Sequence, residues 1–311
     1  MSTSSETPAA QAARDRPLLA ILLKLFAMFL FSLMFAGVKW VGGSVPVGEI
    51  VFFRASIGML MIVLATALTG GLSTLATNRI GTHATRSLLG VTAMFCNFLA
   101  VTLLPLADAT AIAFAAPMFT VILAVLILKE QVHIFRWSAV MIGFAGVLVI
   151  IGAEGRGAGD GNIVGAAFAL TGAGLSATAM IVLRRMSAHE NSEAIAFYFM
   201  LTSALVGLLT IFWGWKWPVG TEFLVLISMG VFGGIGQLFL SFSYRFGEAS
   251  VLAPFDYSMM IWAASLGYFL FDDLPTAQVL IGASFVIGAG LLILWRERVL
   301  GRQRALRAQS L

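Results

Sequence analysis

Long apolar stretches, separated by short polar connections, run through most of the chain. Each stretch approaches the roughly 20 residues that a helix needs to cross the hydrocarbon core of a membrane. The predicted spans cover residues 18–41, 47–69, 86–104, 107–128, 134–151, 163–183, 192–214, 221–244, 248–271 and 275–295. The pattern therefore predicts an all-α membrane protein with ten transmembrane helices, and its short connections leave no room for a soluble domain.

The overall composition excludes an ordinary soluble protein. Hydrophobic residues make up 59% of the chain and charged residues only 11%, whereas soluble proteins contain about 25% charged residues. The single cysteine, Cys96, allows neither an internal disulfide nor a cysteine-based metal site. The sequence contains no nucleotide-binding P-loop and no His-Glu-x-x-His zinc motif. It therefore predicts no cofactor, no metal and no direct use of ATP.

Positive charge is distributed unevenly between the two sides of the predicted bundle. If the N-terminus lies inside, the inner connections and tails hold 14 Lys and Arg residues and the outer connections hold three. Inner loops of membrane proteins carry such an excess, so both termini are expected in the cytoplasm and the protein in the inner membrane. The pI of about 9.6 is then explained by topology and by anionic membrane lipids rather than by nucleic acid.

An internal repeat divides the chain into two halves. At an offset of 144 residues Glu49 aligns with Glu193, and at an offset of 140 Asn97 aligns with Gln237. Each repeat holds five predicted spans, an odd number, so the two repeats are expected to lie in the membrane with opposite orientation, as in many transporters. The expected organisation is a tail at 1–17, repeats at 18–151 and 163–295, a linker at 152–162 and a basic tail at 296–311.

Several segments carry a family resemblance. They are GEIVFFRASIG (48–58), LPLADATAIAFAAPMFTVILAVLILKE (104–130), SYRFGEASVLAPFDYSMMIWAASLGYFLFDDLP (243–275) and GASFVIGAGLLILWRER (282–298). Together they resemble the drug/metabolite transporter superfamily, specifically its tandem EamA-like domains, over nearly the whole chain. The resemblance implies secondary transport of a small polar or heterocyclic metabolite. Within the superfamily the segments are most similar to a bacterial subgroup that includes riboflavin importers, with export of amino acids or related metabolites as the alternative.

Two prolines mark the expected transport site. Pro117 and Pro254 are the only prolines inside predicted spans, and they lie in the fourth and ninth spans, which are repeat partners. Proline removes a backbone donor and interrupts a helix, and such breaks are tolerated at membrane depth where they face protein or a wet cavity. Paired interruptions in equivalent spans indicate a binding site, so both prolines are expected to break their helices at a cavity. A plain kink that shapes packing is the alternative.

Asp256 is the most informative charged residue of the predicted spans. A carboxylate well inside a span is costly and usually functional. Gln237 is expected at a similar depth on the neighbouring antiparallel helix, so the two side chains are predicted to form one polar patch. Asp256 is interpreted as a group that binds substrate or a coupling proton, with a structural counter-ion to Arg54 or Arg245 as the alternative.

Four further polar residues complete the predicted substrate site. Arg54 lies seven residues inside the second span and either binds substrate or pairs across helices. Asn97, Tyr198 and Tyr257 also lie inside spans, where an amide or a phenol needs a partner. Two lysines near the ends of the first span are interpreted differently: Lys24 and Lys39 are expected to extend their ammonium groups towards the membrane surface.

Two other classes of function fit the sequence less well than a transporter. An intramembrane protease would need two carboxylates inside the membrane, and only Asp256 is well inside. The histidines His83, His133 and His189 are all expected in connecting segments, so none is predicted to act as a ligand or a base. A channel would more often show rings of repeated polar residues. The sequence thus predicts a secondary transporter and not an enzyme, with a small-molecule substrate and membrane lipids as its partners.

Overall fold

The computed structural model describes residues 16–69, 71–128, 134–154, 160–186, 190–247 and 249–309, and every regular element in these ranges is helical. The longer helices of the first half are α2 (Pro17–Val41), α3 (Val47–Thr69), α4 (Ile80–Leu103), α5 (Leu106–Ala113), α6 (Ala116–Leu128) and α7 (Ile134–Glu154). Those of the second half are α8 (Asp160–Met186), α9 (Ser192–Leu209), α10 (Thr221–Phe246), α12 (Ser258–Phe271) and α13 (Ala277–Gln309). Short pieces are α11 (Ala249–Leu252) and the 3₁₀ turns η1 (Leu72–Leu75), η2 (Thr210–Trp213) and η3 (Ala253–Tyr257).

Nine stretches within the described ranges are helical, long and apolar enough to cross a membrane. The remaining apolar segment is divided into α11, η3 and α12, and its longest piece, α12, has 14 residues. The chain is therefore a polytopic all-α membrane protein. One predicted boundary was wrong, because the third span starts at Ile80 rather than at residue 86. The last candidate span ends at Arg296, and the helix α13 continues beyond it to Gln309.

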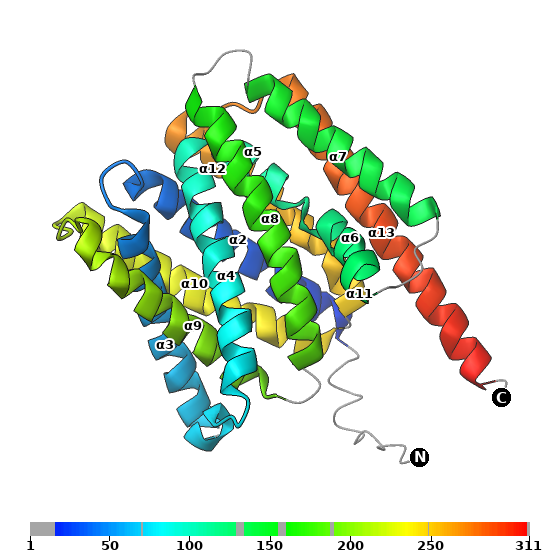
Figure 1. Ribbon diagram of the computed structural model, residues 1–311, viewed down its shortest axis with the longest axis horizontal. Coiled ribbons are helices and arrows are strands. Elements are labelled where there is room, and N and C mark those ends of the chain that lie inside the picture. Colours follow the sequence, from blue (N-terminus) through cyan, green and yellow to red (C-terminus); the bar gives the residue numbers. More distant parts are fainter. Residues whose placement is uncertain are drawn as a thin grey trace.

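The four most extensive helix contacts each join one helix of the first half to one of the second. They are α2 with α10, α4 with α8, α3 with α9, and α7 with α13. The pairing is reciprocal, because the first helix of each half packs on the third helix of the other. Figure 1 shows α7 and α13 side by side along one flank, and it places the start of α2 and the end of α13 towards the same end of the bundle.

Glycine allows the α7–α13 pair to approach closely. A Cβ atom at Gly146 would lie 2.5 Å from the carbonyl oxygen of Gly282, and a Cβ at Gly282 would lie 2.5 Å from the carbonyl oxygen of Gly146. Side chains at either position would push the two backbones apart, as in other small-residue contacts between membrane helices. This contact fixes the last helix of each half against the other.

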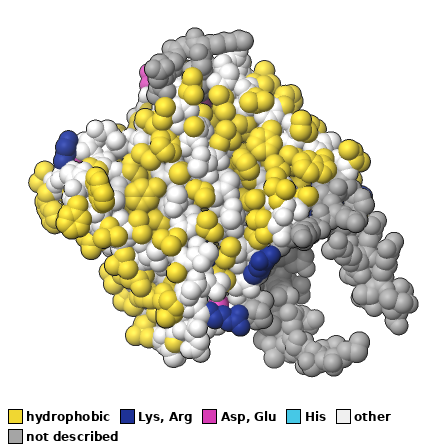
Figure 2. Space-filling model, viewed as in Figure 1, with side chains coloured by type: hydrophobic (Ala, Val, Ile, Leu, Met, Phe, Trp, Pro, Cys, Tyr) yellow, Lys and Arg dark blue, Asp and Glu magenta, His cyan; other side chains and the backbone are white. Residues whose placement is uncertain are grey.

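Large apolar side chains cover the outside of the bundle. Phe212 is 82% exposed, Phe269 78% and Leu68 87%. Hydrophobic side chains dominate the face in Figure 2, and the few visible Lys and Arg lie towards its left and lower parts. In a soluble protein such a surface would aggregate, whereas here it matches the hydrocarbon chains of lipid.

Candidate functional site

The fourth span is broken at the predicted proline. Helix α5 ends at Ala113, four residues before Pro117, and α6 begins at Ala116. A proline ring clashes with the carbonyl four residues earlier and cannot donate to it, which accounts for the end of α5 at this position. The turn is closed by tighter hydrogen bonds, such as Ala115 N to Ile112 O at 2.9 Å.

The ninth span is broken in the same way, and the two breaks are in contact. Pro254 lies in the 3₁₀ turn η3 between α11 and α12. Tyr257, at the end of η3, packs its ring on Phe114, at the end of α5, with ring centroids 4.9 Å apart. The Tyr257 hydroxyl occupies the space that a side chain at position 290 would need, so a larger residue than Gly290 would force Tyr257 to move. The two interruptions therefore form one structural unit between the halves.

An ion pair joins η3 to the first helix of the chain. Lys24 of α2 lies 2.6 Å from Asp256 Oδ1 and donates a hydrogen bond of 2.9 Å to the Tyr244 hydroxyl. Its side chain is 1% exposed, whereas that of Asp256 is 37% exposed. The expectation that Lys24 reaches the membrane surface was therefore wrong, because its ammonium group is neutralised inside the bundle.

Asp256 does not form the predicted patch with Gln237 in this structure. Among the described residues its partner is Lys24 and not Arg54, while the side chain of Arg245 lies outside the described set. Gln237 is half-buried on α10, and among the described contacts none joins its side chain to Asp256.

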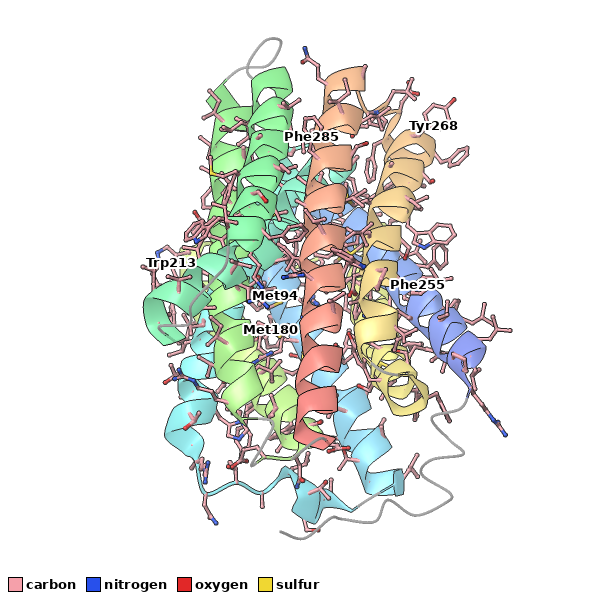
Figure 3. The ribbon with its side chains drawn as sticks, turned by 90° about the vertical axis from the view of Figure 1, so that its right-hand side faces the viewer. Met94, Met180, Trp213, Phe255, Tyr268 and Phe285 are labelled. Atoms are coloured by element: carbon pink, nitrogen blue, oxygen red, sulfur yellow. The ribbon has the colours of Figure 1, made fainter. Side chains whose placement is uncertain are left out.

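Arg54 has an unusual set of partners for a cation in a membrane helix. Its Nε donates to the sulfur of Met34 at 3.1 Å, and its Nη1 donates to the sulfur of Met94 at 3.0 Å. Its guanidinium carbon lies 5.9 Å from the centre of the Phe98 ring. Within the described part of the chain, no carboxylate lies within the 4.0 Å of an ion pair. Met94 lies among the interior helices, whereas Tyr268 projects away from the bundle (Figure 3).

Asn97 lies on α4 but faces a different neighbour. Its Oδ1 is buried and has no hydrogen-bond partner in the described residues. It fills the space beside Gly172 of α8, where an added Cβ would lie 2.5 Å from it. The structure thus places Asn97 between α4 and α8, while Met94 and Phe98 of the same helix face Arg54.

Tyr198 lies outside this central region and contacts a histidine. Its ring centroid is 4.7 Å from that of His83, and His83 Nε2 lies 3.1 Å from Glu190 Oε2. His83 is 2% exposed and belongs to α4, so its predicted place in a connection was wrong; His133 and His189 lie outside the described residues. The hydrogen bonds with His83 and Thr77 and the charge of Arg79 hold the pKa of the Glu190 carboxyl below its usual range.

A second ion pair lies at the other end of α2. Lys39 Nζ is 3.2 Å from Asp273 Oδ2 and donates a hydrogen bond of 2.8 Å to the carbonyl of Leu104. Helix ends leave carbonyls without intrahelical partners. Lys39 donates to such a carbonyl, that of Leu104, just beyond the end of α4. Its side chain is 17% exposed, and its ammonium group is paired with Asp273 near the end of α2.

Sequence reasoning missed both lysine partners and the two methionines. Lys24 lies seven positions after Pro17, the first residue of α2. A lysine side chain can reach the membrane surface from this depth, so the position of Lys24 along the helix did not decide between the surface and the interior of the bundle. The deciding signal is the 3₁₀ geometry that turns Asp256 towards α2, and periodicity does not reveal it. Among the described residues, no group of three or more His, Cys, Asp or Glu side chains could hold a metal ion.

These features define a helical membrane protein whose halves meet at two broken helices. Comparison with known proteins gives its family: the EamA-like transporter family matches residues 18–152 and 163–295. The chain therefore belongs to the EamA-like transporter family, within the drug/metabolite transporter superfamily, and is a transporter rather than an enzyme.

Relatives with assigned names transport different solutes. The chain is 29% identical over 272 residues to the pseudopaline exporter CntI of Pseudomonas aeruginosa, covering 86% of this chain and 93% of the relative. It is 28% identical over 275 residues to an S-adenosylmethionine uptake transporter of Rickettsia prowazekii, covering 87% and 92%. A solved crystal structure shares the fold with a TM-score of 0.64 at 23% identity, covering 90% of this chain and 98% of that one.

Proposed function

We propose that the protein is a secondary transporter that carries a small polar metabolite across the inner membrane by alternating access. The observation that carries the proposal is the contact between the two helix breaks, through Phe114 and Tyr257. Broken helices that meet between two halves form the binding site of many secondary transporters. Tyr257, Pro117 and Pro254 are assigned to this site, with Asp256 in the same 3₁₀ turn as Tyr257 and Gln237 on α10.

The packing of the halves supports an inverted repeat. The first helix of each half packs on the third of the other, the second on the second, and the fifth on the fifth. A twofold relation between five-helix units produces this reciprocal pattern. With an odd number of spans in each unit, the axis lies in the membrane plane, and the halves can rock about a central site.

The two lysine pairs supply reversible contacts at opposite ends of the same helix. Lys24 pairs with Asp256 before α12, and Lys39 pairs with Asp273 after it. The two lysines are separated by roughly 22 Å along α2. We assign the first pair to the closure of one side and the second to the closure of the other, so that each opens in turn.

The location follows from charge and from fold. The excess of Lys and Arg in the inner connections supports cytoplasmic termini. Helical bundles with long apolar spans belong to inner membranes, whereas spanning proteins of bacterial outer membranes are β-barrels. The related bacterial transporters are consistent with this location.

The direction of transport and the metabolite are left open by the relatives' names. One relative is named an exporter and the other an uptake transporter, and riboflavin appears in neither name. Riboflavin uptake thus rests on the resemblance of the sequence alone, and export of amino acids or related metabolites is the competing proposal.

Counterflow in proteoliposomes tests the proposal. Vesicles loaded with an unlabelled solute are given a trace of the labelled one, using riboflavin, S-adenosylmethionine and amino acids in turn. An alternating-access carrier exchanges its solute, so label accumulates transiently and the rate saturates. Flux that rises linearly with concentration and shows no counterflow would indicate a channel and overturn the proposal.

A matched pair of aromatic truncations locates the site. Tyr257→Ala removes the contact between the breaks and is expected to lower exchange by up to about tenfold. Phe269→Ala shortens an aromatic side chain of the same segment that is 78% exposed, and it should leave exchange nearly unchanged. If both variants changed exchange equally, the contact between the helix breaks would not be part of the transport site.

A further inference from the structure

The guanidinium of Arg54 lacks a full set of partners. It carries five N–H donors, and thioether sulfurs are weak acceptors. Two of these donors are met by Met34 and Met94, while Nη2 donates to no atom of the described residues. A cation at membrane depth is costly unless an anion or strong acceptors compensate it. The site therefore has the composition of an anion site whose anion comes from outside the chain.

Arg54 is also specific to one half of the repeat. At the offset of 144 that aligns Glu49 with Glu193, Arg54 aligns with Tyr198. Tyr198 packs on His83 and not on a pair of thioethers. A shared scaffold does not require a cation at this position, so its presence in one half points to a role in binding rather than in the architecture.

The surroundings of Arg54 suit a small ligand with an apolar body. Phe98, which lies beside the guanidinium, packs edge to face on Phe35 with ring centroids 5.7 Å apart. Gly233 of α10 is also close to Arg54, because a Cβ atom added at this glycine would lie 3.6 Å from Arg54 Nε. Arg54 itself is of intermediate burial, and its described neighbours are thioethers, an aromatic ring and a glycine.

We infer that Arg54 binds a carboxylate of the transported molecule, and that the substrates are small carboxylate-bearing metabolites. A planar carboxylate matches the fork of a guanidinium with two parallel hydrogen bonds. One cation is neutralised by one negative charge, whereas a phosphate monoester carries close to two at pH 7 and would leave one uncompensated. The inference names the substrate class for the proposed function and rests on it.

The test uses benzoate as a probe carboxylate and benzamide as its neutral, equally shaped control. Thermal denaturation of the purified full-length protein is followed in detergent with increasing amounts of each probe. A ligand that binds the folded state raises the midpoint according to its affinity. Benzoate is expected to bind about tenfold or more tightly than benzamide, because it alone forms charge-assisted hydrogen bonds with Arg54.

Three variants assign this preference to Arg54. Arg54→Gln is expected to abolish it, and Arg54→Lys to retain it in weakened form because the charge remains without the fork. The matched control is Arg86→Gln: Arg86 also lies in a membrane helix and stacks on the ring of Phe199 at 4.4 Å. Its Nε and Nη1 are buried without a hydrogen-bond partner among the described residues, so this variant tests whether an unpartnered guanidinium is by itself enough to bind benzoate. The control should keep the full preference for benzoate.

The outcomes separate the inference from the proposed function. Equal binding of benzoate and benzamide, or a preference that survives in Arg54→Gln, overturns the anion site even if counterflow is observed. A preference that depends on Arg54 in a protein without counterflow supports the site while the transport mechanism fails.

Discussion

Lys24 and Arg54 are both cations of the first half of the bundle, and the protein treats them in opposite ways. Lys24 is 1% exposed, with Asp256 at 2.6 Å and the Tyr244 hydroxyl at 2.9 Å. Arg54 has two thioether sulfurs and one aromatic ring. Both charges would cost several kcal/mol if they stood alone in hydrocarbon, yet only the lysine is neutralised by the protein itself.

The difference separates a charge that is neutralised by a partner within the protein from one that is left for a ligand. Lys24 connects α2 to η3, and hence the first half to the broken helix of the second. A buried pair is strongly destabilised when one partner is removed, so this contact determines how α2 and η3 are held together. Arg54 connects nothing of opposite charge within the described residues. Its loss should therefore affect binding more than folding.

The largest effect is expected for Asp256→Asn. The substitution leaves the buried Lys24 ammonium without its carboxylate. Loss of one partner of a buried pair costs about 3–5 kcal/mol, and because Asp256 is 37% exposed, solvent screening reduces the expected loss to about 2–3 kcal/mol. The free energy of unfolding in mixed detergents measures it.

The double variant Lys24→Met with Asp256→Asn is the control for this prediction. It removes both charges, so no uncompensated cation is left and most of the lost stability should return. A double variant as unstable as Asp256→Asn alone would mean that the pair contributes through packing rather than charge.

The second effect is a loss of transport without a loss of stability. Arg54→Gln should lower the exchange rate of the identified substrate by about tenfold or more, while the free energy of unfolding stays within about 1 kcal/mol of the parent or rises. Met94→Leu removes one thioether at similar volume and should change stability by less than about 1.5 kcal/mol. If Arg54→Gln unfolds the protein as Asp256→Asn does, the distinction between the two cations is lost.

The sequence predicted most of the fold because a membrane simplifies the problem. Apolar length alone located the spans, and α3 covers the predicted residues 47–69 without change. Both prolines were identified as helix breaks from backbone chemistry, and the structure interrupts its helices beside them. The start of α4 at Ile80 was missed because Arg79 and Arg86 lie near it. Their charges were taken to mark a connection outside the membrane rather than the beginning of the span.

The partners in the site could not be obtained in this way. Hydropathy gives the depth of Lys24, Asp256 and Gln237 but not their rotation about the helix axis. In η3 the chain follows 3₁₀ geometry, so a helical wheel drawn at 3.6 residues per turn misplaces Asp256. The thioether contacts of Arg54 were equally hidden, because methionine is the expected residue of an apolar helix and carries no sign of a partner.

A smaller effect is expected at Lys39, whose surroundings lie between those of the other two cations. Its side chain is 17% exposed and that of Asp273 is 33% exposed, and the Leu104 carbonyl remains as an acceptor when the carboxylate is removed. Asp273→Asn should therefore reduce the free energy of unfolding by about 1 kcal/mol. A loss as large as that of Asp256→Asn would show that burial does not rank these pairs.

The smallest effect concerns His83 and Glu190, a pair that acid should separate. The contacts with His83, Thr77 and Arg79 lower the pKa of the Glu190 carboxyl in the folded state. A lowered pKa means that the carboxylate contributes stability above the ordinary glutamate value of about 4.3, and that this contribution is lost as the pH falls towards the lower folded-state value. The denaturation midpoint, measured from pH 7 to pH 3.5, should therefore fall more steeply below about pH 4.5 in the parent than in Glu190→Gln. The matched control is Glu193→Gln, which changes an exposed carboxylate in the first turn of α9 and should keep the parent's acid dependence. Identical curves for Glu190→Gln and the parent would mean that this pair, unlike Lys24 and Asp256, holds no part of the fold together.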